Sequence, residues 1–169
     1  FARHGLVHPG RAAGLGVIGL SLGVALMQLA GFDEPDEALT QTYRDVFNTL
    51  RANAESMPEL AEPLYPGAAE ALTRLGGQQV TRLAIATGKS RRGADYLLDR
   101  HDWHRVFSSI QTADDAPSKP HPGMIARAMA ETGAEPPETI MIGDTTYDID
   151  MAHAAKVGAL GVTGGYPHR

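Results

Sequence analysis

Cysteine is absent from the sequence, and this absence excludes several kinds of chemistry at once. The chain can form no disulfide bond, no zinc–thiolate site and no cysteine nucleophile. A reducing compartment is compatible with the lack of cysteine, so we expect the protein to be cytoplasmic.

A surplus of basic residues is also missing. The 169 residues include 15 lysines and arginines against 20 aspartates and glutamates, which gives a formal net charge of −5. Proteins that bind the phosphate backbone of nucleic acids usually carry a basic surface. We therefore expect no nucleic-acid partner. The sequence leaves the oligomeric state open, with a homodimer as one option.

No charged residue occurs between Ala12 and Phe32, and a run of this length raises the question of a membrane span or signal peptide. The run contains five glycines, and its densest apolar part, from Leu20 to Leu29, is shorter than a span. We favour a buried amphipathic helix over membrane insertion or secretion, and expect no membrane partner.

The first third of the chain shows helical patterns only. Ser21 is a suitable N-cap for a helix over 22–29. A second helix is predicted over 36–54, and five of its apolar residues share one face, which indicates packing: Leu39, Tyr43, Val46, Phe47 and Leu50.

The remainder alternates short apolar strands with helices of about ten residues, which predicts right-handed βαβ units around a parallel sheet. Turn-rich residues before Leu64 separate it from the helical third. The predicted strands are 81–87, 106–112, 139–142 and 159–163. The predicted helices are 65–75, 90–100, 122–132 and 147–157.

The segment from Thr139 to Asp148 contains the densest polar chemistry. Its apolar run suits a strand that is buried on both faces. Asp144 follows the strand at the sheet edge where open α/β sheets bind ligands, and Asp148 lies on the first turn of the next helix. Mg²⁺ prefers oxygen ligands and often takes one or two carboxylates, with waters and a substrate phosphate in its other coordination positions, so two neighbouring aspartates suit this ion. A simpler interpretation is a capped helix with acids in its first turn.

Two other strand-to-helix junctions carry polar groups. Thr87 and Gly88 precede a helix, where a hydroxyl and free amides can hold a phosphate, although a helix cap alone would explain them. Lys119 stands before a proline, which restricts its backbone, although a solvated surface lysine is the alternative. Together, a hydroxyl, a lysine and two acids on one sheet edge indicate phosphoryl chemistry.

Weaker candidates lie near these junctions. Arg91 and Arg92 can reach a phosphate near Thr87, although a solvated helix start is the simpler interpretation. His101 and His104 have the spacing of a metal pair on a helix, but no further ligand is close in sequence.

The order Thr87-Gly88-Lys89, Ser118-Lys119-Pro120 and Gly143-Asp144 to Asp148 resembles the haloacid dehalogenase superfamily, and most closely its phosphoglycolate-phosphatase-like branch. The resemblance implies that Thr87 is the second motif, Lys119 the third, and Asp144 with Asp148 the fourth. It also implies a helical cap over 1–62 and a Rossmannoid α/β core over 63–169.

The first motif of that superfamily, Asp-x-Asp-Gly-Thr, does not occur in the sequence. In the superfamily this motif supplies the nucleophile and the general acid, and it ends a central strand. We therefore expect the natural chain to extend upstream of Phe1 and beyond Arg169. We also expect a gap, or a substitute strand, between the strands that end at Thr87 and Ile142.

The resemblance implies a Mg²⁺-dependent phosphomonoester hydrolase that acts on a small phosphorylated metabolite, phosphoglycolate-like, through an aspartyl phosphate. Thr87, Lys119 and Asp144 are then the catalytic candidates, with Thr87, Gly88 and Lys119 on the phosphate and Asp144 and Asp148 on the metal. The alternatives are a phosphomutase, or an inactive or phosphate-sensing module.

Overall fold

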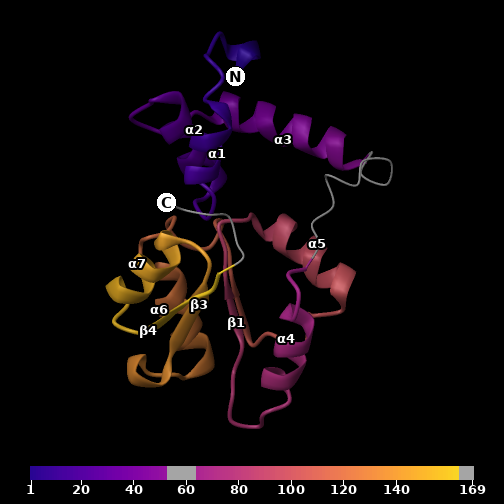
Figure 1. The fold of residues 1–169 in the computed structure, drawn as a ribbon, viewed down its shortest axis with the longest axis vertical. Helices are drawn as coiled ribbons and strands as arrows, with labels where there is room; N and C mark the ends of the chain where they lie inside the picture. The colour runs from indigo at the N-terminus through magenta and orange to yellow at the C-terminus, as the bar shows by residue number, and fades with distance from the viewer. Residues whose placement is uncertain (53–63, 164–169) are drawn as a thin grey trace.

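A computed structural model describes residues 1–52 and 64–163 (Figure 1). Its alternation of strands and helices after Leu64 confirms the predicted α/β class. The predicted boundary at 62/63 and the predicted helix end at Ala54 lie outside the described residues.

The helical third contains η1 (Ala2–His4), α1 (Gly10–Gly16), α2 (Leu22–Ala30) and α3 (Glu37–Ala52). The α/β part contains α4 (Ala68–Gly76), β1 (Ala84–Ala86), α5 (Arg91–His101), β2 (Ser109–Gln111), α6 (Gly123–Thr132), η4 (Pro136–Glu138), β3 (Ile140–Gly143), α7 (Thr146–Ala154) and β4 (Gly158–Gly161).

The helical third is held together by α2 and α3, which bury Leu26 and Leu39. The predicted packing of the whole α3 stripe is wrong beyond Leu39, because the four remaining apolar side chains are 38–45% exposed. The physical reason is length: α3 has 16 residues and α2 only nine, so α2 covers only part of α3. The exposed residues are Tyr43, Val46, Phe47 and Leu50.

The four strands form two separate parallel pairs. β1 pairs with β2, with Ile85 opposite Ile110, and β3 pairs with β4, with Ile142 opposite Leu160. Within the described ranges no ladder joins β1 to β3, and no other strand stands between them. The predicted gap between these two strands is therefore confirmed.

Each of β1 and β3 has an open edge, where backbone N–H and C=O groups point away from the paired strand. The residues at these edges follow from the alternating direction of the backbone groups along each strand. Thr87 N donates to Gln111 O, and Gly143 O accepts from Val162 N, so these residues face their partner strands. Because successive residues face opposite sides, the amides and carbonyls at the intervening positions point away from the partners. These positions, called here the facing edges, are Ala84, Ala86, Ile140 and Ile142.

The expectation that the Ile140–Ile142 strand is buried on both faces is wrong. Ile140 is 57% exposed and Ile142 48%, whereas Met141 packs against the core. Leu160 and Val162 of the neighbouring segment are similarly exposed. The reason is that helices of the described chain cover only the Met141 face of this strand pair.

One buried cluster connects the two strand pairs. Met124 and Ile125 of α6 pack with Met151 and Ala152 of α7, and Ala86 of β1 and Met141 of β3 pack against this cluster. Both pairs therefore share one layer of helices, which places the ends of their strands near each other. Figure 1 shows the helical third at the end of the α/β part from which α5 and α7 begin.

Candidate functional site

Lys119 and Asp148 form a buried ion pair at the centre of the candidate site. Lys119 Nζ lies 2.5 Å from Asp148 Oδ1, and the two side chains are 7% and 4% exposed. The alternative of a solvated surface lysine is therefore wrong. A charge-assisted hydrogen bond in a dry environment fixes the position of the ammonium group.

Asp148 is itself held by the start of α7. Thr145 is the N-cap, its hydroxyl accepts from Asp148 N at 3.3 Å, and Asp148 Oδ2 accepts from Thr145 N at 3.1 Å and from Thr145 Oγ1 at 2.8 Å. This is the reciprocal capping box expected at a helix start. Both oxygens of Asp148 are therefore engaged, one by Lys119 and one by Thr145.

Asp144 differs from Asp148 in its surroundings. Its side chain is partly exposed, and within the part of the chain that the structure describes it has no hydrogen-bond or ion-pair partner. An unengaged carboxylate at a strand end fits Mg²⁺, which takes one or two carboxylates and completes its shell with waters and phosphate oxygens. No group of three or more potential metal ligands occurs among the described residues, so a protein-only cage is not present there.

The Thr87 junction forms a tight turn before α5. Thr87 N donates to Gln111 O at 3.0 Å, and the Thr87 hydroxyl accepts from Lys89 N at 3.2 Å. Ser90 caps α5 by accepting from Gly93 N. The cap interpretation thus holds for Ser90, while the Thr87 hydroxyl keeps its proton for donation to a ligand.

A polar network that the sequence did not predict connects the Thr87 junction to the Lys119 junction. Arg91 Nη2 donates to Asp115 Oδ2 at 2.7 Å and to Ile110 O at 2.6 Å. Arg91 N donates to Asp114 Oδ2 at 2.7 Å. The Nη2 atom of Arg91 is therefore engaged within this network, while the side chain as a whole is 39% exposed. Its pairing with the Asp114-Asp115 dipeptide was not visible because the residues are separated by 23 and 24 positions.

Asp115 is the centre of this network. Thr112 donates to Asp115 Oδ2 through its amide at 2.9 Å and through its hydroxyl at 2.6 Å. Burial raises the pKa of Asp115, but the hydrogen bonds from Thr112 and the charge of Arg91 outweigh it, so the pKa lies below the ordinary value of 3.8. The Asp115 carboxylate therefore stays ionised and holds the two junctions together.

The three junctions meet under one segment of the helical third, the 16–21 loop (Gly16–Ser21), which connects α1 to α2. Ser21 N donates to Ser118 Oγ at 2.9 Å. A Cβ on Gly88 would lie 2.5 Å from Leu20 O, which shows how closely the loop approaches the Thr87 junction. The structure thus joins Lys119 and Asp148 directly, and brings the Thr87 junction to them through this loop.

Two weaker candidates have structural roles. His101 stacks on Trp103 with ring centroids 4.7 Å apart, and His104 Nε2 lies 2.7 Å from Asp99 Oδ1. Trp103 also packs edge-on against Phe107. The described residues therefore offer no metal site at this position.

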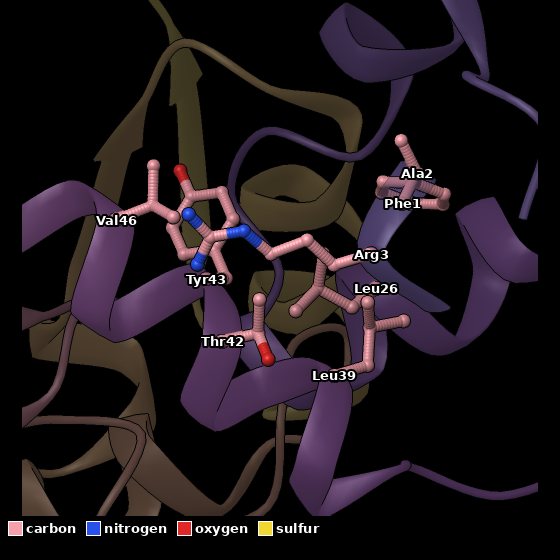
Figure 2. A pocket seen from close by; sticks show the side chains of 8 residues that line it. All are labelled: Phe1, Ala2, Arg3, Leu26, Leu39, Thr42, Tyr43 and Val46. Atoms are coloured by element: carbon pink, nitrogen blue, oxygen red, sulfur yellow. The ribbon is translucent and has the colours of Figure 1, made fainter. Parts of the chain in front are cut away.

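A separate hollow of about 240 Å³ lies within the helical third (Figure 2). It opens between η1, α2 and α3, and Arg3 extends across it beside Tyr43. None of the predicted site residues lines this hollow.

No described helix is both long enough and apolar enough to cross a bilayer.

Comparison with known proteins identifies related sequences and folds. The profile of the family described as Haloacid dehalogenase-like hydrolase matches residues 3–162. The protein named Probable phosphatase IndB, from Dickeya dadantii, is 38% identical over 149 residues, which are 88% of this chain and 64% of that protein. A Phosphoglycolate phosphatase from Aliivibrio fischeri is 34% identical over 62% of this chain and 46% of its own length. The chain thus spans about half to two thirds of these curated relatives.

Solved structures give the same relationship at the level of the fold. A structure from Bacteroides fragilis, described as a haloacid dehalogenase-like hydrolase, superposes with a TM-score of 0.78 at 27% identity. The match covers 99% of this chain and 77% of that one. A hydrolase from Pseudomonas syringae has a TM-score of 0.76 at 24% identity, covering 95% of this chain and 71% of its own, and supports the fold alone.

Proposed function

Since the chain belongs to the haloacid dehalogenase-like hydrolase family, we propose that it forms most of a Mg²⁺-dependent phosphomonoester hydrolase. The proposed substrate is a small phosphorylated metabolite, in line with the names of the relatives in the phosphoglycolate phosphatase group. The observation that carries the proposal is the buried pair of Lys119 and Asp148 at the carboxyl edge of the strands. In the proposal, residues 1–62 are the cap, 63–169 the core, and the location is cytoplasmic.

In the proposal, the phosphoryl group is held by the Thr87 junction and the Lys119 junction. The Thr87 hydroxyl donates to one phosphoryl oxygen, while the amides of Lys89 and Arg91 are already engaged by the Thr87 hydroxyl and by Asp114. Lys119 supplies the positive charge, because its ammonium retains two protons besides the one directed at Asp148. Charge that develops on the phosphoryl oxygens during transfer is then stabilised by groups that need no rearrangement.

The two acids have different roles in this proposal. Asp144 holds Mg²⁺ together with waters and a phosphate oxygen, because its carboxylate is not engaged elsewhere in the described chain. Asp148 supports the metal site from the adjacent turn, but its main task is to position Lys119. When bound, Mg²⁺ neutralises phosphate charge and orients the phosphoryl group.

The nucleophile is assigned to a strand between β1 and β3. Its aspartate would attack phosphorus and release the alcohol, which receives a proton from a second acid, and water would then cleave the aspartyl phosphate to inorganic phosphate. We expect this strand from sequence upstream of Phe1. A phosphomutase would use the same groups but return the phosphoryl group to a sugar.

The gap between β1 and β3 favours a second candidate function for the chain taken by itself. Without a nucleophile, Thr87, Lys119 and Asp144 can bind phosphate and Mg²⁺ but cannot form the covalent intermediate. The chain would then be an inactive or phosphate-sensing module.

Measurement of phosphate release separates the two functions. We expect Mg²⁺-dependent turnover of small phosphomonoesters, phosphoglycolate among them, by a protein that supplies the additional strand, and none by residues 1–169 alone. Turnover by a chain verified to begin at Phe1 would show that the nucleophile lies elsewhere. Phosphate binding without turnover in the longer protein would favour the sensing module.

Substitution of Asp144 tests the metal assignment. Asp144→Asn should abolish Mg²⁺-dependent turnover and weaken Mg²⁺ binding measured by calorimetry, while the protein stays folded. Asp150→Asn is the matched control, because Asp150 is an exposed acid on the following helix, α7, and its substitution should be neutral. Full activity in Asp144→Asn would remove Asp144 from the metal site.

A further inference from the structure

The segment from Asp115 to Lys119, called here the bridge segment, is held by an ion pair at each end. At its first residue, Asp115 Oδ2 accepts from Arg91 Nη2 at 2.7 Å, and Arg91 begins α5, the helix that follows β1. At its last residue, Lys119 Nζ pairs with Asp148 of α7, the helix that follows β3. The bridge segment therefore ties the two strand pairs together at the carboxyl ends of β1 and β3.

The Arg91 end of this connection consists of more than one hydrogen bond. Arg91 Nη2 also donates to Ile110 O at 2.6 Å, so one guanidinium nitrogen joins two oxygens of the neighbouring segment. The main chains meet beside it, where Lys89 O accepts from Ala113 N at 2.9 Å. These contacts fix the start of α5 against the residues that lead into the bridge segment.

Both proposed phosphate ligands lie close in sequence to the Arg91–Asp115 pair. Thr87 precedes Arg91 by four residues, and Lys119 follows Asp115 by four residues. The residues between have little freedom, because Thr87 lies in a tight turn and Pro117 fixes one backbone torsion of the bridge segment. A change in the pair should therefore alter the spacing between the Thr87 hydroxyl and the Lys119 ammonium group.

The Arg91–Asp115 pair is partly exposed, with 39% of the Arg91 side chain and 26% of the Asp115 side chain accessible to solvent. Ion pairs at this exposure add little to stability. Asp115 Oδ2 also accepts two hydrogen bonds from Thr112, and these do not depend on Arg91. The specific contribution of Arg91 is therefore geometric, since it sets where one segment lies relative to the other.

We propose that Arg91 and Asp115 are positioning residues, which hold the Thr87 hydroxyl and the Lys119 ammonium group at the spacing that the transition state of phosphoryl transfer requires. This inference rests on the proposed phosphatase function. The transition state needs both groups on the phosphoryl oxygens at once, whereas a bound substrate tolerates a slightly longer contact to either one. Loss of the pair should therefore slow turnover more than it weakens binding.

Steady-state kinetics of the intact protein, with phosphoglycolate as substrate, tests this role. Arg91→Gln should lower kcat by about ten- to a hundredfold, because a small displacement of catalytic groups has effects of this size, while KM changes by less than about threefold. Arg91→Lys keeps the positive charge and should recover part of kcat. Arg100→Gln, at an exposed arginine near the other end of α5, is the matched control and should keep full activity. A raised KM with unchanged kcat would overturn the proposal.

Two inhibitors separate positioning from simple phosphate binding. Orthovanadate adopts a five-coordinate geometry like that of phosphorus during transfer, whereas inorganic phosphate resembles the product. In Arg91→Gln the inhibition constant of orthovanadate should rise by about ten- to a hundredfold, and that of phosphate by less than about threefold. Equal rises for the two inhibitors would make Arg91 a residue that supports phosphate binding only, and would overturn the positioning role.

A double-mutant cycle tests whether the two residues act as one pair. Asp115→Asn should lower kcat by about the same factor as Arg91→Gln, and the double variant should be no slower than either single variant. Asp102→Asn, at an exposed aspartate that follows α5, is the control. If the two losses multiply in the double variant, the residues act separately and the pair is not the positioning unit.

Amide hydrogen exchange, followed by NMR in the intact protein, tests the contact without any need for turnover. In Arg91→Gln the Ala113 amide should exchange about two- to tenfold faster, whereas the Thr87 amide, which donates to Gln111 O, should stay protected. Unchanged exchange at Ala113 would overturn the tie between the two segments, whatever the enzyme does. If the intact protein hydrolyses no phosphomonoester, the proposed function fails and the positioning role fails with it, and faster exchange at Ala113 would then assign Arg91 to the fold alone.

Discussion

Lys119 Nζ and Asp148 Oδ1 lie 2.5 Å apart in a site where only 7% and 4% of the two side chains are exposed. At this degree of burial, the two charges depend on each other, because either one alone would remain in a medium that solvates it poorly. The pair therefore connects stability to the candidate chemistry.

Lys119→Ala should destabilise the protein as well as remove its proposed phosphate contact. Leaving Asp148 unpaired should lower the free energy of unfolding by about 3–5 kcal/mol, measured by urea denaturation. In an active protein, turnover should fall by about 10²–10³. Lys156→Ala, at an exposed lysine, is the control. Wild-type stability in Lys119→Ala would contradict the buried pair, whereas Lys119→Met combined with Asp148→Asn should recover part of the loss.

Gly143→Ala should disrupt the capping box of α7. A Cβ at this position would overlap Cβ and Cγ of Asp148 and lie 2.6 Å from its Oδ2. The strain should lower the free energy of unfolding by about 1–3 kcal/mol. Gly161 is the matched control, because it pairs with Gly143 and its Cβ would meet only Ile149 Cδ1, at 4.0 Å. Equal effects of the two alanines on the denaturation midpoint would contradict this account.

Gly88→Ala should move the 16–21 loop away from the site. The nearest atoms to its Cβ are backbone carbonyl oxygens of Leu20 and Gly19, which cannot rotate away as a side chain can. We expect faster amide exchange at Ser21. Gly93→Ala is the control, since its Cβ would have ordinary contacts at 3.5 Å and 3.6 Å, and alanine favours the helix. Undisturbed exchange at Ser21 in Gly88→Ala would show that the loop tolerates the added atom.

Asp115 predicts a pH dependence of stability. Because its pKa in the folded state lies below the ordinary 3.8, its contribution is present above that pH and is lost as the pH falls through the folded-state pKa. Asp115→Asn should therefore lower the free energy of unfolding more at about pH 7 than at about pH 3. Arg91→Gln should reduce the same pH dependence, and Arg91→Lys should retain part of it. If Asp115→Asn lowered the free energy of unfolding equally at both pH values, the role of the ionised carboxylate would be contradicted.

The strands and most helices could be predicted from the sequence because their periodicity and end signals are local. Ser21 was recognisable as a polar residue before a helix, and it is the N-cap of α2 in the structure. By contrast, α1 was not predicted, because its seven residues include three glycines and no apolar stripe. The pairing of Arg91 with Asp115 was not predicted either, since it depends on the parallel register of β1 and β2.

The motif spacing could indicate which residues are candidates for the site but not how they share their contacts. Asp144 and Asp148 were equivalent as metal ligands in the sequence. In the structure Asp148 is engaged by Lys119 and Thr145, and Asp144 has no such partner in the described chain. That difference follows from the reciprocal hydrogen bonds of Thr145, which depend on the backbone geometry of the helix start.

The facing edges of β1 and β3 supply the last prediction, which amide exchange can test residue by residue. In residues 1–169 the amides of Ala84, Ala86, Ile140 and Ile142 should exchange faster than those of Ile85 and Met141, because only the latter two face a hydrogen-bonded partner strand. The alternation within each strand is an internal control for local flexibility, which would affect neighbours equally.

A strand placed between β1 and β3 should reverse this pattern. In a longer chain that contains the expected upstream strand, the facing edges should become as well protected as their neighbours, and the melting temperature should rise because exposed apolar side chains such as Ile142 and Leu160 would gain contacts. Equal protection of Ala86 and Ile85 already in residues 1–169 would mean that β1 has a second partner. If β1 and β3 were then found to pair directly, no position would remain for the nucleophile, and the proposed hydrolase mechanism would fail with the topology on which it depends.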